Sequence, residues 1–205
     1  MPTTLCHIAA SAFTVLVASL VLFPTTLNAQ VPQVERIDIF DAGIYCAETI
    51  EKIRDPDDPT GYRGVISSFK LQKRTTKIPV QVGLSFGMRY SIVGTPNDAI
   101  VPIRVVTRIP PPGVRNPETG KTVLVSDYIV SVRVGATPYR EYHIEYDWEG
   151  IPGVWVFEYW YKDRKLAEQR FTLSRMTPAQ KRNSGGASCS PLVSSLMVPM
   201  TGRSD

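Results

Sequence analysis

The stretch GLSFG at residues 83–87 has the spelling G-x-S-x-G, which in α/β hydrolases places a nucleophilic serine at a sharp turn between a strand and a helix. The other members of a Ser–Asp–His triad follow Ser85 in the chain order of that fold. Asp98 or Asp127 would supply the acid, and His143 would supply the base. Serine hydrolysis is therefore the first activity to weigh.

The residues around Ser85 favour a strand over a catalytic turn. Every even-numbered position from 78 to 92 is apolar, whereas the odd-numbered positions hold mainly small or polar residues. This alternation is typical of one continuous strand with a buried face, and Ser85 would lie in its middle on the small, polar face. We therefore predict that Ser85 is extended, lies far from His143 and is not catalytic. A small serine hydrolase using Ser85 and His143 is the alternative.

Two other segments resemble ligand-binding motifs. Gly120-Lys121-Thr122 ends like a phosphate-binding loop, but Arg115 stands where that motif needs its first glycine, so 116–121 is better explained as a hairpin turn. The aspartates of DPDDPTG at 55–61 could bind calcium, yet the prolines and the missing glutamate favour a solvated loop. We expect no cofactor and no nucleotide.

The acidic residues at 141, 145 and 147 alternate with apolar ones around His143, and we interpret them as the wet face of a strand. Beyond residue 29 the chain holds one histidine and two cysteines, Cys46 and Cys189, which cannot build a convincing zinc site. An exported chain could pair the cysteines. Because nothing near Cys189 would hold it in place, we expect a free, buried Cys46 instead.

The first 29 residues predict export. Residues 8–23 form an uncharged apolar run, and Leu27-Asn28-Ala29 offers a signal-peptidase site. Cleavage would place Gln30 at the mature N-terminus, in the periplasm or outside the cell, with no stable membrane span left. An uncleaved anchor at 8–23 is the alternative.

Charge argues against nucleic acid as a partner. Residues 174–205 contain four basic residues and one acidic residue, so they carry +3 of the net +4, and residues 30–173 carry the remaining +1. A nearly balanced body is not the basic surface that polyanion binding needs. The segment from 176 onward is rich in Ser, Gly and Pro, which predicts disorder. The expected organisation is a signal peptide at 1–29, one domain at 30–174 and a disordered tail at 175–205.

The body reads as strands separated by turn residues. Strands are expected at 34–46, 64–73, 78–92, 101–109, 129–134, 141–148, 153–161 and 165–173. Short helical turns are expected at 47–53 and 178–182. This pattern predicts an all-β fold, a single antiparallel immunoglobulin-like β-sandwich of about seven to eight strands.

Aromatic residues concentrate in 151–173. Alternation places Trp155, Phe157, Tyr159 and Tyr161 on one face of a strand, and the turn at 162–165 returns the chain as a hairpin. The main interpretation is a hairpin that closes the sandwich. The alternative is a binding surface, since exposed aromatic rings stack on sugars or partner proteins. Its residues would be Trp155, Tyr159, Trp160 and Tyr161.

Three segments resemble one bacterial family. They are FGMRYSIVG at 86–94, RIPPPGVRNPETGK at 108–121 and PGVWVFEYWYKDRKLAEQRFTL at 152–173. They are similar to the domain-of-unknown-function family 3859. The resemblance implies an exported or envelope-associated domain without an established activity, and it brings no catalytic residues. We therefore expect a non-catalytic module that binds a protein or glycan of the cell envelope.

Overall fold

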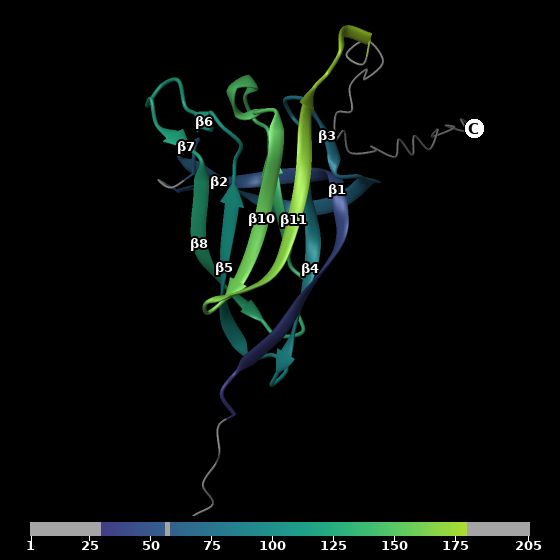
Figure 1. Cartoon of the computed structure of the whole chain (residues 1–205), viewed down its shortest axis with the longest axis vertical. Coiled ribbons are helices and arrows are strands. Elements are labelled where there is room, and N and C mark those ends of the chain that lie inside the picture. The colour runs from purple at the N-terminus through teal and green to yellow at the C-terminus, as the bar shows by residue number, and fades with distance from the viewer. Residues whose placement is uncertain (1–29, 56–57, 180–205) are drawn as a thin grey trace, which may run out of the picture. The chain divides into compact units, whose positions relative to one another are not determined.

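The computed structural model describes residues 30–55 and 58–179, and they form an all-β fold with almost no helix (Figure 1). The strands are β1 (Gln33–Arg54), β2 (Tyr62–Arg74), β3 (Lys77–Val80), β4 (Ser85–Thr95), β5 (Ile100–Arg108), β6 (Val114–Arg115), β7 (Thr122–Val123), β8 (Val125–Arg133), β9 (Tyr139–His143), β10 (Gly153–Tyr161) and β11 (Arg164–Arg175). A 3-10 turn at Asp147–Glu149 follows β9. No helix in this described part is long and apolar enough to cross a membrane.

The strands form two larger sheets and one small hairpin. The four-stranded sheet has the order β2-β1-β4-β9, and the five-stranded sheet has the order β3-β11-β10-β5-β8. All pairings are antiparallel except that of β3 with β11. In Figure 1, β8, β5, β10 and β11 run side by side, and β2 crosses them. The expected hairpin turn at 116–121 is confirmed, since it joins β6 to β7.

The core lies between the two sheets. The ring of Phe86 on β4 lies 5.7 Å from that of Trp155, 5.9 Å from Phe157 and 5.4 Å from Phe171, all on β10 or β11. Each of these four side chains is fully buried. Such aromatic contacts stabilise a core beyond the burial of apolar area alone. The two sheets therefore pack face to face as a sandwich.

The described residues form eleven strands, more than the seven to eight expected, and one reason is a break in the strand predicted at 78–92. A turn at 81–84, closed by a hydrogen bond from Leu84 N to Gln81 O, separates β3 from β4. Gly83 has φ +82° in this turn, a conformation that glycine adopts at little cost. The chain thereby moves from one sheet to the other, which the uninterrupted alternation concealed.

The helical turn predicted at 47–53 is wrong, because these residues continue β1. Residues 46–54 pair with 62–70 of β2 and with no other strand, and we call this two-stranded extension the arm. Its residues are mostly exposed on both faces. A strand without a buried face has no apolar alternation, so no pattern in the sequence indicated this one.

Other predictions have mixed outcomes. The strand expected at 141–148 ends at His143. Cys46 is disulfide-bonded, so the expected free thiol is wrong, and its partner lies outside the described residues. The signal peptide, Asp57, Cys189 and the segment 180–205 also lie outside them. Of the turn expected at 178–182, only 178 and 179 are described, and they are helical.

Candidate functional site

Ser85 and His143 lie in direct contact, so the prediction that they are far apart is wrong. Their strands pair with Ser85 directly opposite His143, and Ser85 Oγ is 2.9 Å from His143 Nδ1. A period-two pattern shows which face a residue occupies but not which strand lies beside it. The register of β4 against β9 was therefore invisible in the sequence.

The pair does not have the connections of a catalytic triad. Burial raises the pKa of the Glu141 carboxyl, and a hydrogen bond from the Ser85 hydroxyl offsets part of that rise. Glu141 thus interacts with Ser85 rather than with the histidine, and the direction of the bond between Ser85 Oγ and His143 Nδ1 depends on the histidine tautomer. A general base must instead accept the proton of the nucleophile, and the acid must orient the histidine.

Access to Ser85 is also missing. The residue is 1 % exposed, and it begins β4 instead of lying in the middle of a strand as predicted. Ten further strand residues follow it rather than a helix. The expected acids lie elsewhere, since Asp127 forms an ion pair with Arg104, and Asp98 accepts a hydrogen bond from Asn97 in a turn. Burial lowers the pKa of His143, which favours its neutral form.

A cavity of about 300 Å³ lies beside this pair. It is lined by the arm, by residues 58–60, by β5 and β8 of the five-stranded sheet, and by residues from Tyr139 to Glu149. Both sheets and the arm thus contribute walls. His143 and Glu141 line this cavity, whereas Ser85 does not. The prediction of a simple wet strand face at 141–147 is therefore wrong at these two residues.

Arg140 is the central cation of the cavity. It pairs with Met88 across the strands, so its side chain points between the two sheets. The guanidinium donates to Glu141 O at 2.7 Å and to Thr107 Oγ1 at 3.2 Å. It lies 5.4 Å from the ring centroid of Tyr128 and 5.5 Å from that of Phe157. Its Nε is buried without a hydrogen-bond partner.

The other cations of the cavity are paired. Lys52 forms an ion pair with Glu145, and Arg63 lies 3.7 Å from Asp55. Within residues 30–55 and 58–179, Arg140 has no carboxylate within ion-pair distance. Its direct partners are aromatic rings and neutral oxygens, and the carboxyls of Glu141 and Asp58 interact with its charge from a longer distance.

Two carboxyls lie on the opposite wall, and both are engaged by their own loops. Glu149 is 2 % exposed and accepts bonds from the backbone N of Glu145 and Tyr146 at 2.5 and 2.7 Å. Burial raises the pKa of Glu149 to about 7 against these hydrogen bonds. Burial also raises the pKa of Asp58, whose Oδ1 accepts two bonds from Thr60. Asp58 is half-buried, so the fully solvated loop predicted at 55–61 is wrong at this residue.

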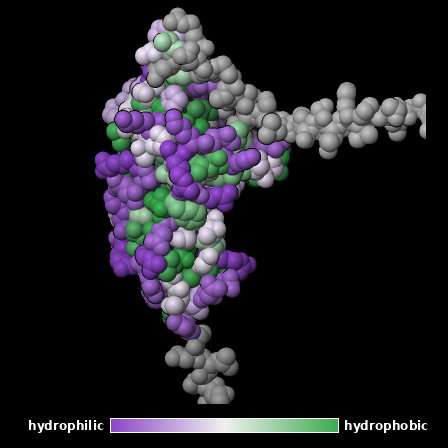
Figure 2. Space-filling model, turned by 90° about the vertical axis from the view of Figure 1, so that its right-hand side faces the viewer, coloured by the Kyte–Doolittle hydropathy of each residue, from purple (hydrophilic) through white to green (hydrophobic). Residues whose placement is uncertain are grey.

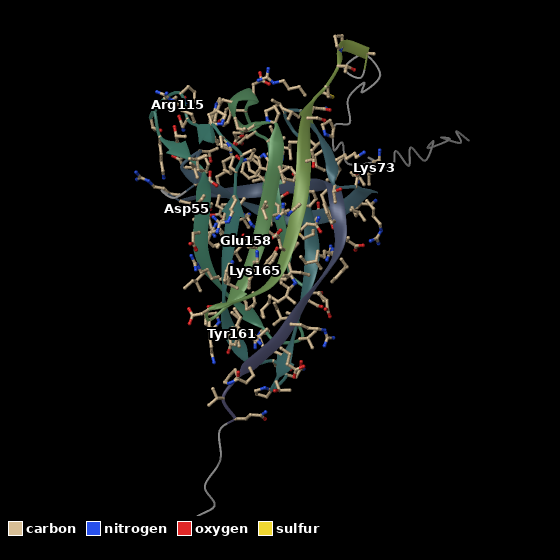
Figure 3. The ribbon with its side chains drawn as sticks, viewed as in Figure 1. Asp55, Lys73, Arg115, Glu158, Tyr161 and Lys165 are labelled. Carbon is tan, nitrogen blue, oxygen red and sulfur yellow. The ribbon has the colours of Figure 1, made fainter. Side chains whose placement is uncertain are left out.

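The aromatic residues of β10 do not form the surface considered in the sequence. Trp155 and Tyr159 are fully buried, and Tyr161 is 5 % exposed. Trp160 is half-buried, and its Nε1 donates to Glu158, which is also held by Arg108 and Lys165. Figure 3 labels Glu158, Lys165 and Tyr161 along β10 and β11. Three of the four rings belong to the core, so they cannot stack on a partner.

Neither a metal centre nor a large apolar face is evident. Among the residues that the structure describes, no three His, Cys, Asp or Glu side chains gather as metal ligands would. On the face drawn in Figure 2, apolar areas are interrupted by hydrophilic ones. A second cavity is lined by residues 33–35 and 161–164, and we take the cavity around Arg140 as the candidate site because both sheets and the arm contribute to it.

Comparison with known proteins supplies a family and remote structural matches. The family model described as "Domain of unknown function (DUF3859)" matches residues 33–173. No curated protein matches the chain. A crystal structure of an immunoglobulin-like protein from Pseudomonas aeruginosa is 21% identical over 71% of this chain and 98% of the other, with a TM-score of 0.44. A Pseudomonas fluorescens alkylpurine DNA glycosylase bound to DNA is 18% identical over 48% and 27%, with a TM-score of 0.31.

Proposed function

The chain belongs to the family of the domain of unknown function DUF3859, and we propose that it acts as a non-catalytic, immunoglobulin-like binding module of the bacterial cell envelope. The observation that carries this proposal is the cavity of about 300 Å³, because concave sites with a few convergent polar groups are where proteins take ligands. We propose that a group of an envelope protein or glycan enters this cavity.

Export is part of the same proposal. The apolar run at 8–23 and the Leu27-Asn28-Ala29 site support delivery to the periplasm or the exterior. No nucleic acid and no cofactor are required by this function. A binding module needs only a shaped site on a stable scaffold, and the sandwich supplies one.

A pair of tryptophan variants tests the role of the cavity. Thr49 lines the cavity from the exposed arm, so Thr49→Trp should fill part of it without disturbing the core. Ser68→Trp adds the same ring at an exposed arm position outside the lining and serves as the control. Each tagged protein is used for affinity capture from a periplasmic extract. We expect one envelope partner to co-purify with the wild type and the control but not with Thr49→Trp.

Equal recovery of that partner by all three proteins would contradict the proposal, because it would place the binding surface elsewhere. Failure of the wild type to recover any partner would contradict it as well. Melting temperatures of the three proteins, measured in parallel, establish that each is folded during the capture.

Serine hydrolysis is the second candidate, favoured by the 2.9 Å contact between Ser85 and His143. It predicts labelling of Ser85 by a fluorophosphonate probe and loss of the label in His143→Ala. Because Ser85 is 1 % exposed, we expect no labelling of the folded protein. Labelling that depends on both Ser85 and His143 would show that the protein is a serine hydrolase and would contradict the proposal of a non-catalytic binding module.

A further inference from the structure

The arrangement around Arg140 specifies what the cavity accepts. We infer that it binds a carboxylate group carried on an apolar or aromatic body, such as the C-terminal residue of a peptide. This inference rests on the proposed binding function and names its ligand chemistry. It depends on three observations: a cation without a direct ion-pair partner, hydrogen-bond donors without acceptors, and tyrosine and isoleucine side chains among the residues of the walls.

The unpaired cation is the first observation. Removing a guanidinium from water is costly unless an opposite charge or saturated hydrogen bonding offsets the loss. Arg140 points between the sheets and has no ion-pair partner within the described residues, unlike Lys52 and Arg63 on the same cavity. A structural arginine in such a position normally has a carboxylate partner. A carboxylate ligand would supply the direct ion-pair partner that the more distant carboxyls of Glu141 and Asp58 do not.

Open donors are the second observation. A guanidinium has five N–H groups, and Arg140 uses two of them, toward Glu141 O and Thr107 Oγ1. Nε is buried without an acceptor. Arg140 and Thr107 both line the cavity, so the guanidinium stands at its wall. The planar guanidinium matches the two oxygens of a carboxylate in geometry as well as in charge.

The walls are the third observation, and they select among anions. Tyr128 and Tyr142 line the cavity together with Ile109 and Ile66, which suits an apolar or aromatic body. The carboxyls of Asp58, Glu141, Glu145 and Glu149 also line it. Because they would repel a doubly charged group, a single carboxylate is favoured over a phosphate. Asp58 and Glu149 are already bonded to their own loops, so neither is a free acceptor for the hydroxyls of a sugar.

The test uses small probes with the purified protein. N-acetylphenylalanine is titrated at millimolar concentrations and followed by NMR of the protein and by its melting temperature. Its amide, which has the same body without the charge, is the matched ligand control. Glucuronate and inorganic phosphate represent the sugar and phosphate alternatives. We expect saturable binding of N-acetylphenylalanine and weaker binding of the other three.

The variants isolate the guanidinium. Arg140→Met should bind N-acetylphenylalanine about tenfold to a hundredfold more weakly, as expected for loss of hydrogen bonds to a charged group. It should melt no lower than the wild type, because it removes an unpaired buried cation. Arg104→Met, which removes an exposed cation paired with Asp127, should bind normally. Should Arg140→Met fail to fold, Thr107→Val removes only the hydroxyl that holds the guanidinium and should weaken binding severalfold.

Four results would overturn the inference. They are absence of N-acetylphenylalanine binding to the wild type, equal binding of its amide, unchanged binding after loss of the Arg140 or Thr107 contact, and tighter binding of glucuronate or phosphate. Affinity capture from the periplasmic extract shows whether only the carboxylate inference fails or the proposed binding function fails as well. If the partner is lost in Thr49→Trp but still binds Arg140→Met, the proposal of a binding module is supported and the inference of a carboxylate ligand is wrong.

Discussion

At the scale of single residues, both glycines of GLSFG have structural reasons that do not involve catalysis. Gly83 takes φ +82° in the turn that leads into β4. Gly87 lies opposite Glu141, and a Cβ added there would stand 2.0 Å from the carbonyl oxygen of Arg140. The glycine therefore lets β4 approach the backbone of β9, and the motif results from packing.

Gly87→Ala is expected to destabilise the fold. The neighbouring atoms belong to the backbone of β9 and cannot rotate away, so the strands must separate. We expect a loss of about 1–3 kcal/mol in the free energy of unfolding, typical of overpacking, measured by urea denaturation. Gly64→Ala on the exposed arm meets only the side chain of Thr49 and should change stability much less. Equal effects would mean that β4 and β9 do not approach this closely.

A second single residue, Glu149, makes the stability of the folded protein depend on pH. Burial raises its pKa to about 7 in the folded state from 4.5, so folding favours the protonated carboxyl. The resulting stabilisation is fully present below pH 4.5 and is lost as pH rises through about 7. We expect Glu149→Gln to flatten the fall of melting temperature across this window.

Glu168→Gln is the control for that measurement. The hydrogen bond and charge of Lys165 lower the pKa of Glu168, so its contribution is lost only as pH falls below its ordinary range. Glu168→Gln should leave the change of melting temperature with pH between pH 4.5 and about 7 unchanged. A wild-type melting temperature that rises across this window and keeps rising in Glu149→Gln would show that Glu149 is not the group responsible.

At the scale of elements, the arm is the wall of the cavity with the fewest supports. Residues 46–54 and 62–70 pair only with each other, and most of their side chains are exposed. Segments with little buried area open locally at low free energy. We expect the amides of the arm to exchange with deuterium well before those of β4 and β10. If the amides of the arm exchange as slowly as those of β4, the arm must be stabilised by contacts beyond its own strand pairing.

Comparison of the predicted strands with the observed strands shows how much of the fold the sequence could predict. The alternation of β5, β10 and β11 is confirmed, because each strand has one face against the core. At 81–84 the apolar alternation continues through a turn, so it wrongly predicted one unbroken strand. At 47–53 neither face of the strand is buried, so there is no alternation to detect. The candidate site was missed for a different reason. Strand register decides that Ser85 meets His143 and that Arg140 points inward, and register arises from long-range pairing that one strand's pattern does not contain.

At the scale of the whole molecule, fold and candidate site belong to one unit. The family match at 33–173 includes every described residue that lines the cavity, from Thr49 to Glu149. Two sheets supply opposite walls, so a ligand in the cavity would contact both and stabilise their packing. Ligand binding to the folded state alone raises the melting temperature by mass action. Thermal stability therefore reports directly on occupancy of the cavity.

Export is the prediction that belongs to the complete chain. We expect the periplasmic protein to begin at Gln30, as intact-mass measurement would show. Cleavage after Ala29 would leave the fold whole, because β1 begins at Gln33 and its first pair is with Thr95. Tyr161 also donates to Pro32 O at 2.8 Å, so the described contacts of β1 begin just beyond the cleavage site. A chain that still begins at Met1 in the membrane fraction would establish the uncleaved anchor instead, and the module would then act at the membrane surface.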